Sequence, residues 1–107
     1  MNVVSGREIY QVVWPRGRKM VEVTDIAPRL DKLDGKTIGE LWDYLFRGDE
    51  IFPVLEEELG RRLPGVRFVR YEVFGSTHGS DERKVLAELP ERLRAHGVDA
   101  VISGMAC

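Results

Sequence analysis

The apolar residues between positions 36 and 103 change their spacing from one segment to the next, and this alternation limits the folds open to the chain. Residues 36–42, 66–74 and 98–103 are enriched in β-branched and aromatic types, which favour strands. The stretches between them carry apolar residues every three or four positions, which is typical of amphipathic helices. Strands that alternate with helices predict a parallel sheet with right-handed crossovers. We therefore expect an α/β fold, in which a β-α-β-α-β unit forms one three-layer half of a doubly wound parallel sheet.

Two amphipathic helices are expected between these strands. The first covers residues 49–63, and Pro53 is compatible with it because N–H groups in the first turn have no intrahelical acceptor. The second starts at an N-cap supplied by Gly79 or Ser80, and Pro90 should kink or divide it. The apolar face of the first helix is formed by Ile51, Phe52, Leu55, Leu59 and Leu63.

The amino-terminal part of the chain is expected to be separate from this unit. Residues 8–14 and 20–24 alternate like strands on either side of a Pro- and Gly-containing turn, which predicts a β-hairpin or a flap. The domain division that follows is an N-terminal hairpin and connector over residues 1–34 and a βαβαβ half-domain over residues 35–107.

A parallel sheet of three strands leaves both faces in need of cover. Both faces of such a sheet are apolar, and two helices barely cover them. A chain of 107 residues also buries a smaller share of its surface than a larger domain does. We expect the polypeptide to be completed by a second copy, by a different subunit or by a continuation. The alternative is a small self-sufficient domain whose hairpin covers the second face.

Charge and composition exclude several classes of protein. The net charge of -2 argues against a nucleic-acid binder. No apolar run reaches the length of about 18 residues that a membrane span needs, and no signal pattern begins the sequence, so we expect a cytoplasmic protein. One cysteine cannot form an internal disulfide, and one cysteine with two scattered histidines does not make a metal site.

The loops that follow the three strands should meet at the carboxyl edge of the sheet, where open α/β sheets bind ligands. The middle loop holds hydroxyl groups between glycines at a helix start, where free N–H groups attract anions. A plain turn with a helix cap explains the same residues, and neither the dinucleotide nor the Walker A spacing occurs. Asp43, just after the first strand, could reach the same ligand or serve only as a cap. The candidate anion-binding residues are Gly75, Ser76, Thr77, Gly79, Ser80 and Asp43.

Two side chains at this edge are the candidate catalytic residues. His78 could be a general acid or base, or a loop histidine that bonds a carbonyl. Cys107 is either an inert small hydrophobe or, if a helix follows it in this chain or in a partner, a thiol made acidic by the positive end of that helix. Trp42, Tyr44 and Phe46 in the first loop would form an apolar wall there or fill the core.

Four segments together resemble the UGSC-type (seleno)protein family, over roughly residues 12–107. They are IAPRLDKLDGKTIGELWD, GDEIFPVLEEELGRRLPGVRF, FGSTHG and HGVDAVISGMAC. In that family the strand similar to DAVISG runs into Sec or Cys, then Gly-Ser-Cys, and then further α/β units. The general plan is similar to Asp/Glu racemase-like and flavodoxin-like proteins. Cys107 corresponds to the first motif position or to the residue before it, and Gly-Ser-Cys does not follow it here.

The resemblance implies redox or thiol-nucleophile chemistry. The loop at residues 75–80 predicts a small anionic substrate, and no cofactor is expected. We expect the amino-terminal half of a thiol- or selenol-dependent enzyme, an oxidoreductase-type subunit whose active site another chain completes. The missing motif would lie in a separate subunit, or a UGA codon for selenocysteine would have been read as a stop. The alternatives are a non-catalytic partner-binding or regulatory module and a racemase-like proton-transfer subunit. A flavodoxin-like cofactor carrier is less favoured, because the first loop lacks a hydroxyl-rich phosphate cradle.

Overall fold

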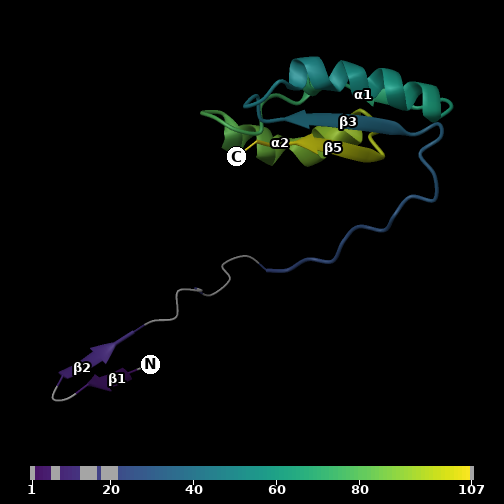
Figure 1. Cartoon of the computed structure of the whole chain (residues 1–107). Helices are drawn as coiled ribbons and strands as arrows, with labels where there is room; N and C mark the ends of the chain where they lie inside the picture. The colour runs from purple at the N-terminus through teal and green to yellow at the C-terminus, as the bar shows by residue number, and fades with distance from the viewer. Residues whose placement is uncertain (1, 6–7, 13–16, 18–21, 107) are drawn as a thin grey trace.

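Strands and helices alternate from residue 37 onward in the computed structural model, which describes residues 2–5, 8–12, 17 and 22–106 (Figure 1). The α/β body contains three strands, two α-helices and one short 3-10 helix. The elements in chain order are β1 (Asn2–Ser5), β2 (Glu8–Gln11), β3 (Thr37–Trp42), α1 (Gly48–Arg62), β4 (Arg67–Val69), the 3-10 helix η1 (Tyr71–Val73), α2 (Glu82–Ala95) and β5 (Ala100–Gly104).

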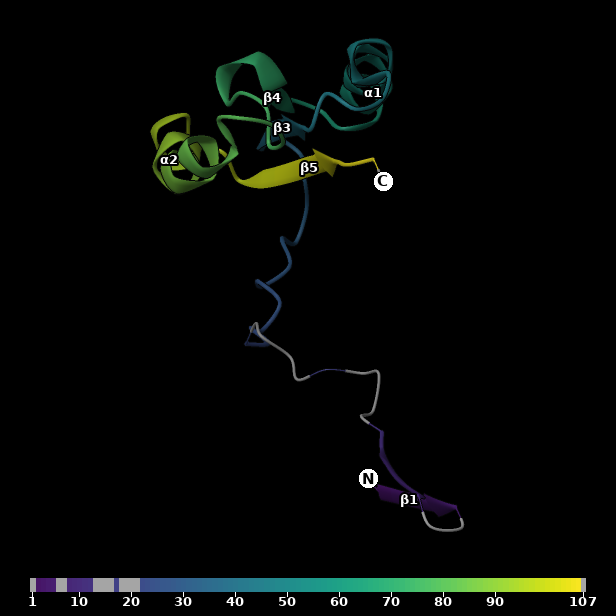
Figure 2. The same ribbon diagram turned by 90° about the vertical axis from the view of Figure 1, so that its left-hand side faces the viewer.

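The three strands of the body form a parallel sheet in the order β4-β3-β5. Ile38 on the central strand lies opposite Phe68 on one side and Ala100 on the other, and Trp42 lies opposite Gly104. Figures 1 and 2 place α1 and α2 on opposite sides of this sheet. The expected α/β fold with a three-stranded parallel sheet and two helices is therefore confirmed. Because the strands are parallel, the loops that follow them lie at one edge.

The core lies mainly between the central strand and α1. All six residues of β3 are buried, as expected for a strand with a neighbour on each side. Trp42, Phe52 and Tyr71 form one cluster, and all three are less than 10% exposed. Gly48 lets α1 begin directly on the Trp42 ring, because a Cβ atom there would lie 2.5 Å from Trp42 Cε2. Burial of these rings is the main force that holds α1 to the sheet.

The second strand is shorter than its sequence predicts, so the expectation of a strand over residues 66–74 is wrong in part. β4 ends at Val69, and the chain continues as η1. Tyr71 and Phe74 are both buried, whereas Val73 is 38% exposed. A 3-10 helix has three residues per turn, so it turns positions 71 and 74 inward together, which a strand with a period of two cannot do.

The helices also differ from expectation in detail. Ile51 on α1 is 45% exposed, whereas Phe52 next to it is 2% exposed. The buried face of α1 is therefore centred about one residue later in the chain than the spacing of apolar residues every four positions from Ile51 indicated. Asp81, rather than Gly79 or Ser80, occupies the N-cap of α2 and makes no side-chain cap hydrogen bond. Pro90 lies inside α2 without dividing it.

The amino-terminal strands pair differently from the expected hairpin. β2 pairs antiparallel with β1, and Val3 lies opposite Tyr10. Residues 22–24 are not in a strand, and positions 13–16 and 18–21 lie outside the described residues. The radius of gyration is 21.3 Å, whereas a compact chain of this length has one of about 13 Å. Figures 1 and 2 show why, because β1 and β2 stand away from the α/β body and cover neither face of its sheet.

Candidate functional site

Loops that follow all three parallel strands are joined at the carboxyl edge of the sheet, as expected. The Thr77 N–H donates to the Trp42 carbonyl at 3.2 Å, which ties the middle loop to the first. The Ala106 N–H donates to Asp43 Oδ2 at 2.7 Å, which ties the segment after β5 to the first loop as well. We call the residues 43–47, 75–80 and 105–106 the rim.

The Asp43 carboxylate is the centre of the rim. It is 5% exposed, and its other oxygen, Oδ1, accepts the Leu45 N–H at 3.0 Å. The hydrogen bond from Ala106 lowers the pKa of Asp43 more than burial raises it, and Leu45 and the charge of His78 lower it further. The group is therefore an anion at neutral pH. A carboxylate that already accepts two N–H groups and repels other anions is suited to position the backbone rather than to hold an anionic ligand.

The middle loop closes on itself through one serine. The Ser76 hydroxyl donates to the His78 carbonyl at 2.6 Å and accepts the His78 N–H at 3.2 Å. Gly75 and Gly79 have φ angles of +85° and +115°, which residues with a side chain rarely adopt. Glycine at both ends therefore permits the conformation of the loop. Beyond this turn, the N–H groups of Gly79 and Ser80 have no hydrogen-bond partner among the described residues. These exposed donors are the part of the loop that can meet an anion.

An aromatic wall stands beside Asp43. Tyr44 stacks on Trp42 with ring centroids 4.1 Å apart, and Tyr71 packs edge-on against both rings. Tyr44 has a φ of +63°, an uncommon value for a residue with a side chain, and it is 45% exposed. Phe46 lies at the edge of the Trp42 ring. Trp42 thus fills the core, whereas Tyr44 faces solvent at the rim.

Sequence reasoning missed two residues that the structure places in this region. The strand-like composition of residues 66–74 places Tyr71 in a strand, and only its three-residue spacing to Phe74 indicates a 3-10 turn with both rings buried. Glu40 was not singled out, although a glutamate in the middle of an apolar strand is itself a signal. It is 1% exposed and lies on the central strand under α1.

The candidate residues are distributed as follows. The Ser76 hydroxyl lies 3.4 Å from the Asp43 carbonyl, and the Thr77 N–H bonds the carbonyl of the preceding Trp42. The charge of His78 acts on the Asp43 carboxylate. His78, Gly79 and Ser80 are exposed, whereas Gly75, Ser76 and Thr77 are half-buried. Cys107 lies outside the described residues, and the Asp43 carboxylate holds the backbone of its neighbour Ala106.

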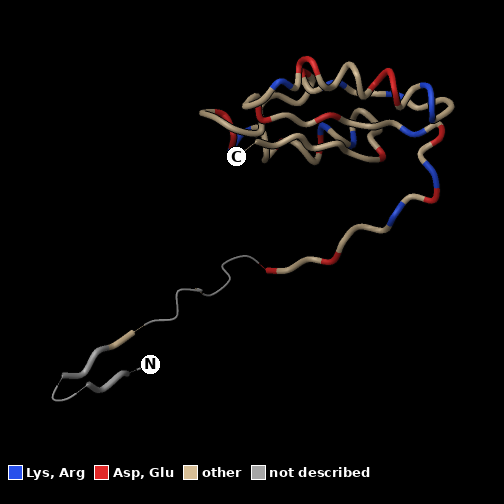
Figure 3. The backbone as a smooth tube through the Cα atoms, viewed as in Figure 1, with Lys and Arg blue, Asp and Glu red and all other residues tan. Residues whose placement is uncertain are grey.

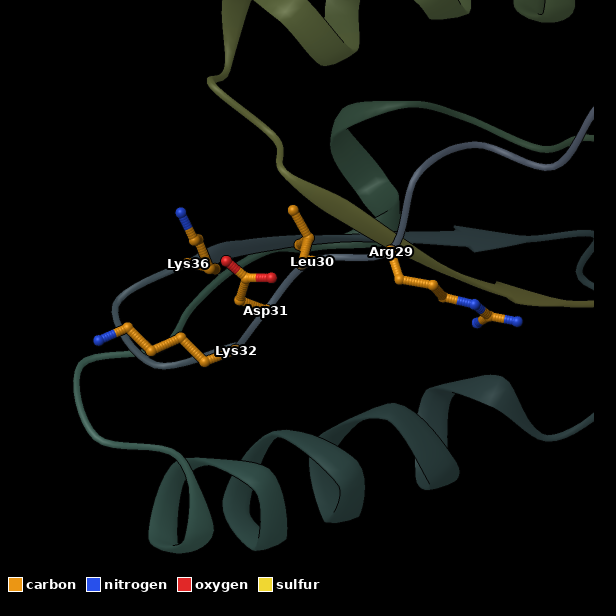
Figure 4. Close-up of a pocket in the computed structure, with 5 residues that line it drawn as sticks. All are labelled: Arg29, Leu30, Asp31, Lys32 and Lys36. Carbon is orange, nitrogen blue, oxygen red and sulfur yellow. The ribbon is translucent and has the colours of Figure 1, made fainter.

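Two surface hollows lie away from the rim. One, of about 270 Å³, is lined by Arg29, Leu30, Asp31, Lys32 and Lys36, just before β3 begins. Figure 4 shows that the side chains of Arg29, Lys32 and Lys36 point in different directions, so they do not converge on one anion. The other, of about 470 Å³, lies between residues 26–33 and the start of β5. Neither hollow is lined by residues of the rim.

Charged residues of both signs are interspersed along α1 and α2 (Figure 3). Across the part of the chain that the structure describes, no three His, Cys, Asp or Glu side chains gather as metal ligands would. Neither helix in the described residues combines the length and the apolar character needed to cross a lipid bilayer.

The family model described as the UGSC family matches residues 11–107. No curated protein and no solved structure matches the chain.

Proposed function

The chain belongs to the UGSC family, and from this membership we propose that it is the amino-terminal half of a thiol- or selenol-dependent α/β enzyme. The enzyme would act on a small anionic substrate at the rim. In this proposal the three strands are one half of a doubly wound sheet, of the plan found in Asp/Glu racemase-like and flavodoxin-like proteins. Another chain supplies the rest of the active site.

One observation carries the proposal, the 2.7 Å hydrogen bond from the Ala106 N–H to Asp43. It fixes the backbone immediately before Cys107 to the loop after the central strand. The charge of His78 acts on the same carboxylate. Asp43 is then a positioning residue, Cys107 or its neighbour in a completing chain is the nucleophile, and His78 exchanges protons with the reacting groups.

The substrate would be held through its negative charge. The N–H groups of Gly79 and Ser80 are free and exposed at the start of α2. The positive end of the α2 dipole adds to their attraction, since no side chain caps that helix. Ser76 shapes this loop from inside and is not itself available as a donor, because its hydroxyl bonds the His78 carbonyl.

The reaction that fits these groups is thiol–disulfide exchange. The Cys107 thiolate attacks a sulfur of a small anionic disulfide, the first thiolate product leaves and takes a proton from His78, and a mixed disulfide remains. A second thiol on the completing chain then attacks this mixed disulfide, releases the second product and forms an enzyme disulfide. Proton transfer of the racemase kind is the alternative chemistry for the same cysteine and histidine.

The incomplete sheet supports a partner. Within the described residues β5 is paired only with β3, and Val101 on β5 is 40% exposed. Edge strands without charge or proline invite pairing with another chain. The same observation favours the second candidate function, a partner-binding or regulatory module without catalysis.

Alkylation of Cys107 separates the two functions. The chain has a single cysteine, so iodoacetamide labelling followed by mass spectrometry reports on that thiol alone. We expect the labelling rate to rise at a pH below the value of about 8.5 typical of a free thiol. His78→Gln should move this midpoint upward, and the matched control His96→Gln, at the far end of α2, should not. If the pH midpoint of Cys107 labelling is that of an ordinary thiol in the unsubstituted chain and in both variants, the result would favour the non-catalytic module.

A further inference from the structure

A glutamate is buried in the middle of the central strand, where parallel sheets normally hold apolar residues. Glu40 is 1% exposed, and its neighbour across the ladder on β5 is Ile102. Its Oε1 atom has no hydrogen-bond partner among the described residues. Because a carboxylate with an unpartnered oxygen is expensive to bury, the packing around Glu40 depends on whether the carboxyl holds its proton.

The neighbours of Glu40 make its ionisation harder. α1 contributes Glu56, whose carboxyl is near enough to share a proton with Glu40 and to repel its negative charge. Burial, with these two effects of Glu56, raises the pKa of Glu40 to about 8. The charge of Arg70 and a hydrogen bond from the Tyr71 backbone act in the opposite direction. Arg70 is shared, since its Nε lies 3.3 Å from Glu56 Oε1 and its Nη1 lies 3.8 Å from Glu72 Oε1.

We propose that Glu40 makes the packing of α1 on the sheet depend on a proton. With the proton present, the Glu40 and Glu56 carboxyls share a hydrogen bond across the interface between the strand and the helix. Without it, two carboxylates face each other there, and one already shared guanidinium lies beside them. The helix then loosens from the sheet at alkaline pH.

This loosening reaches the rim through the start of the helix. α1 begins at Gly48, which touches the Trp42 ring, and the loop that precedes it carries Asp43. Glu40 and Trp42 lie two residues apart on β3 and therefore face the same side of the sheet. A proton at Glu40 thus controls how firmly the aromatic wall and the first loop of the rim are held.

The sign of the effect follows from linkage. The folded chain binds the Glu40 proton more tightly than the unfolded chain, whose glutamates titrate near 4.5. The stability that this proton contributes is complete below that pH and is lost as the pH rises through about 8.

Urea unfolding at a series of pH values tests the proposal. The full chain is used in a Trp14→Phe background, so that Trp42, the second of the two tryptophans, is the fluorescent probe. Glu40→Gln is compared with the Trp14→Phe reference and with Glu57→Gln, a matched control at an exposed position of α1. In the reference and in Glu57→Gln, we expect the urea midpoint to fall as the pH rises through about 8. In Glu40→Gln, this fall should be absent.

A fall of the same size and inflection in Glu40→Gln would overturn the proposal, because every other group that titrates near this pH, Cys107 included, is still present. A flat reference profile would overturn it as well. Glu56→Gln supplies a second measurement if Glu40→Gln fails to fold. Its neutral amide can donate to ionised Glu40, so the inflection should move to lower pH by about one unit. An unmoved inflection in that variant contradicts the shared proton.

Discussion

Replacement of Phe52 by alanine should destabilise the chain far more than replacement of Ile51, its neighbour on α1. Phe52 is 2% exposed and packs against Tyr71, with ring centroids 5.4 Å apart, and against Trp42. Removal of a fully buried phenylalanine ring costs about 3–5 kcal/mol, because the transfer energy is lost and a cavity remains. Since small domains are stable by only about 5–15 kcal/mol, Phe52→Leu, with an expected cost of about 1–2 kcal/mol, is the safer quantitative variant.

Ile51→Ala is the matched control, one residue away on the same helix. Ile51 is 45% exposed, so only about half of the roughly 1.5–3 kcal/mol that a buried isoleucine contributes is present to be lost. Alanine is also the better helix former by several tenths of a kcal/mol. The net cost should therefore stay within about 1 kcal/mol.

Urea unfolding, followed by far-UV circular dichroism, measures both costs. We expect equal slopes for the reference and the variants, and a midpoint that shifts much further for Phe52→Ala than for Ile51→Ala. Equal costs, or a larger cost for Ile51→Ala, would refute the orientation of α1. The helix would then be turned by about one residue, or 100°, toward the face that the leucine spacing alone indicated.

Two glycine predictions use the same assay. Gly35 has a φ of +70° with open space around its missing side chain, so Gly35→Ala should cost about 1 kcal/mol through backbone strain alone, whereas Gly60→Ala, in equally open space inside α1, should stabilise by up to about 1 kcal/mol. A stabilising Gly35→Ala would contradict the left-handed turn before β3. Gly104→Ala places a Cβ atom 2.6 Å from Phe46 Cζ at the end of β5, and we expect a loss of about 1–3 kcal/mol in unfolding free energy. A neutral Gly104→Ala would mean that Phe46 moves freely and does not pack against β5.

The order of elements in the body could be predicted because it depends on local periodicity. The central strand and both helices lie within one or two residues of the segments that the apolar spacing indicated. The convergence of the loops could be predicted too, since it follows from parallel strands. The family membership agrees with the resemblance of the four sequence segments.

What the sequence could not indicate depends on contacts between distant positions. The hydrogen bond between Asp43 and Ala106 joins residues 63 positions apart, and no local sequence pattern predicts it. Strand-like composition in residues 66–74 could not show that Tyr71 and Phe74 would both find buried places, which favoured a 3-10 turn over a longer strand. The sequence predicted residues 20–24, rather than β1, as the partner of β2. Short strand-like segments lie on both sides of β2 in the sequence, and local composition does not distinguish which of them pairs with it.

The distance between the amino-terminal strand pair and the α/β body has a consequence for binding by mass action. Residues 22–36 alone can span up to about 50 Å when extended. This segment joins the body at the start of β3, at the edge of the sheet opposite the rim, and the six residues of β3 span only about 20 Å. A molecule held by β1 and β2 would therefore remain within reach of the rim. Tethers of this length give local concentrations in the millimolar range, so weak contacts at the rim would suffice for capture.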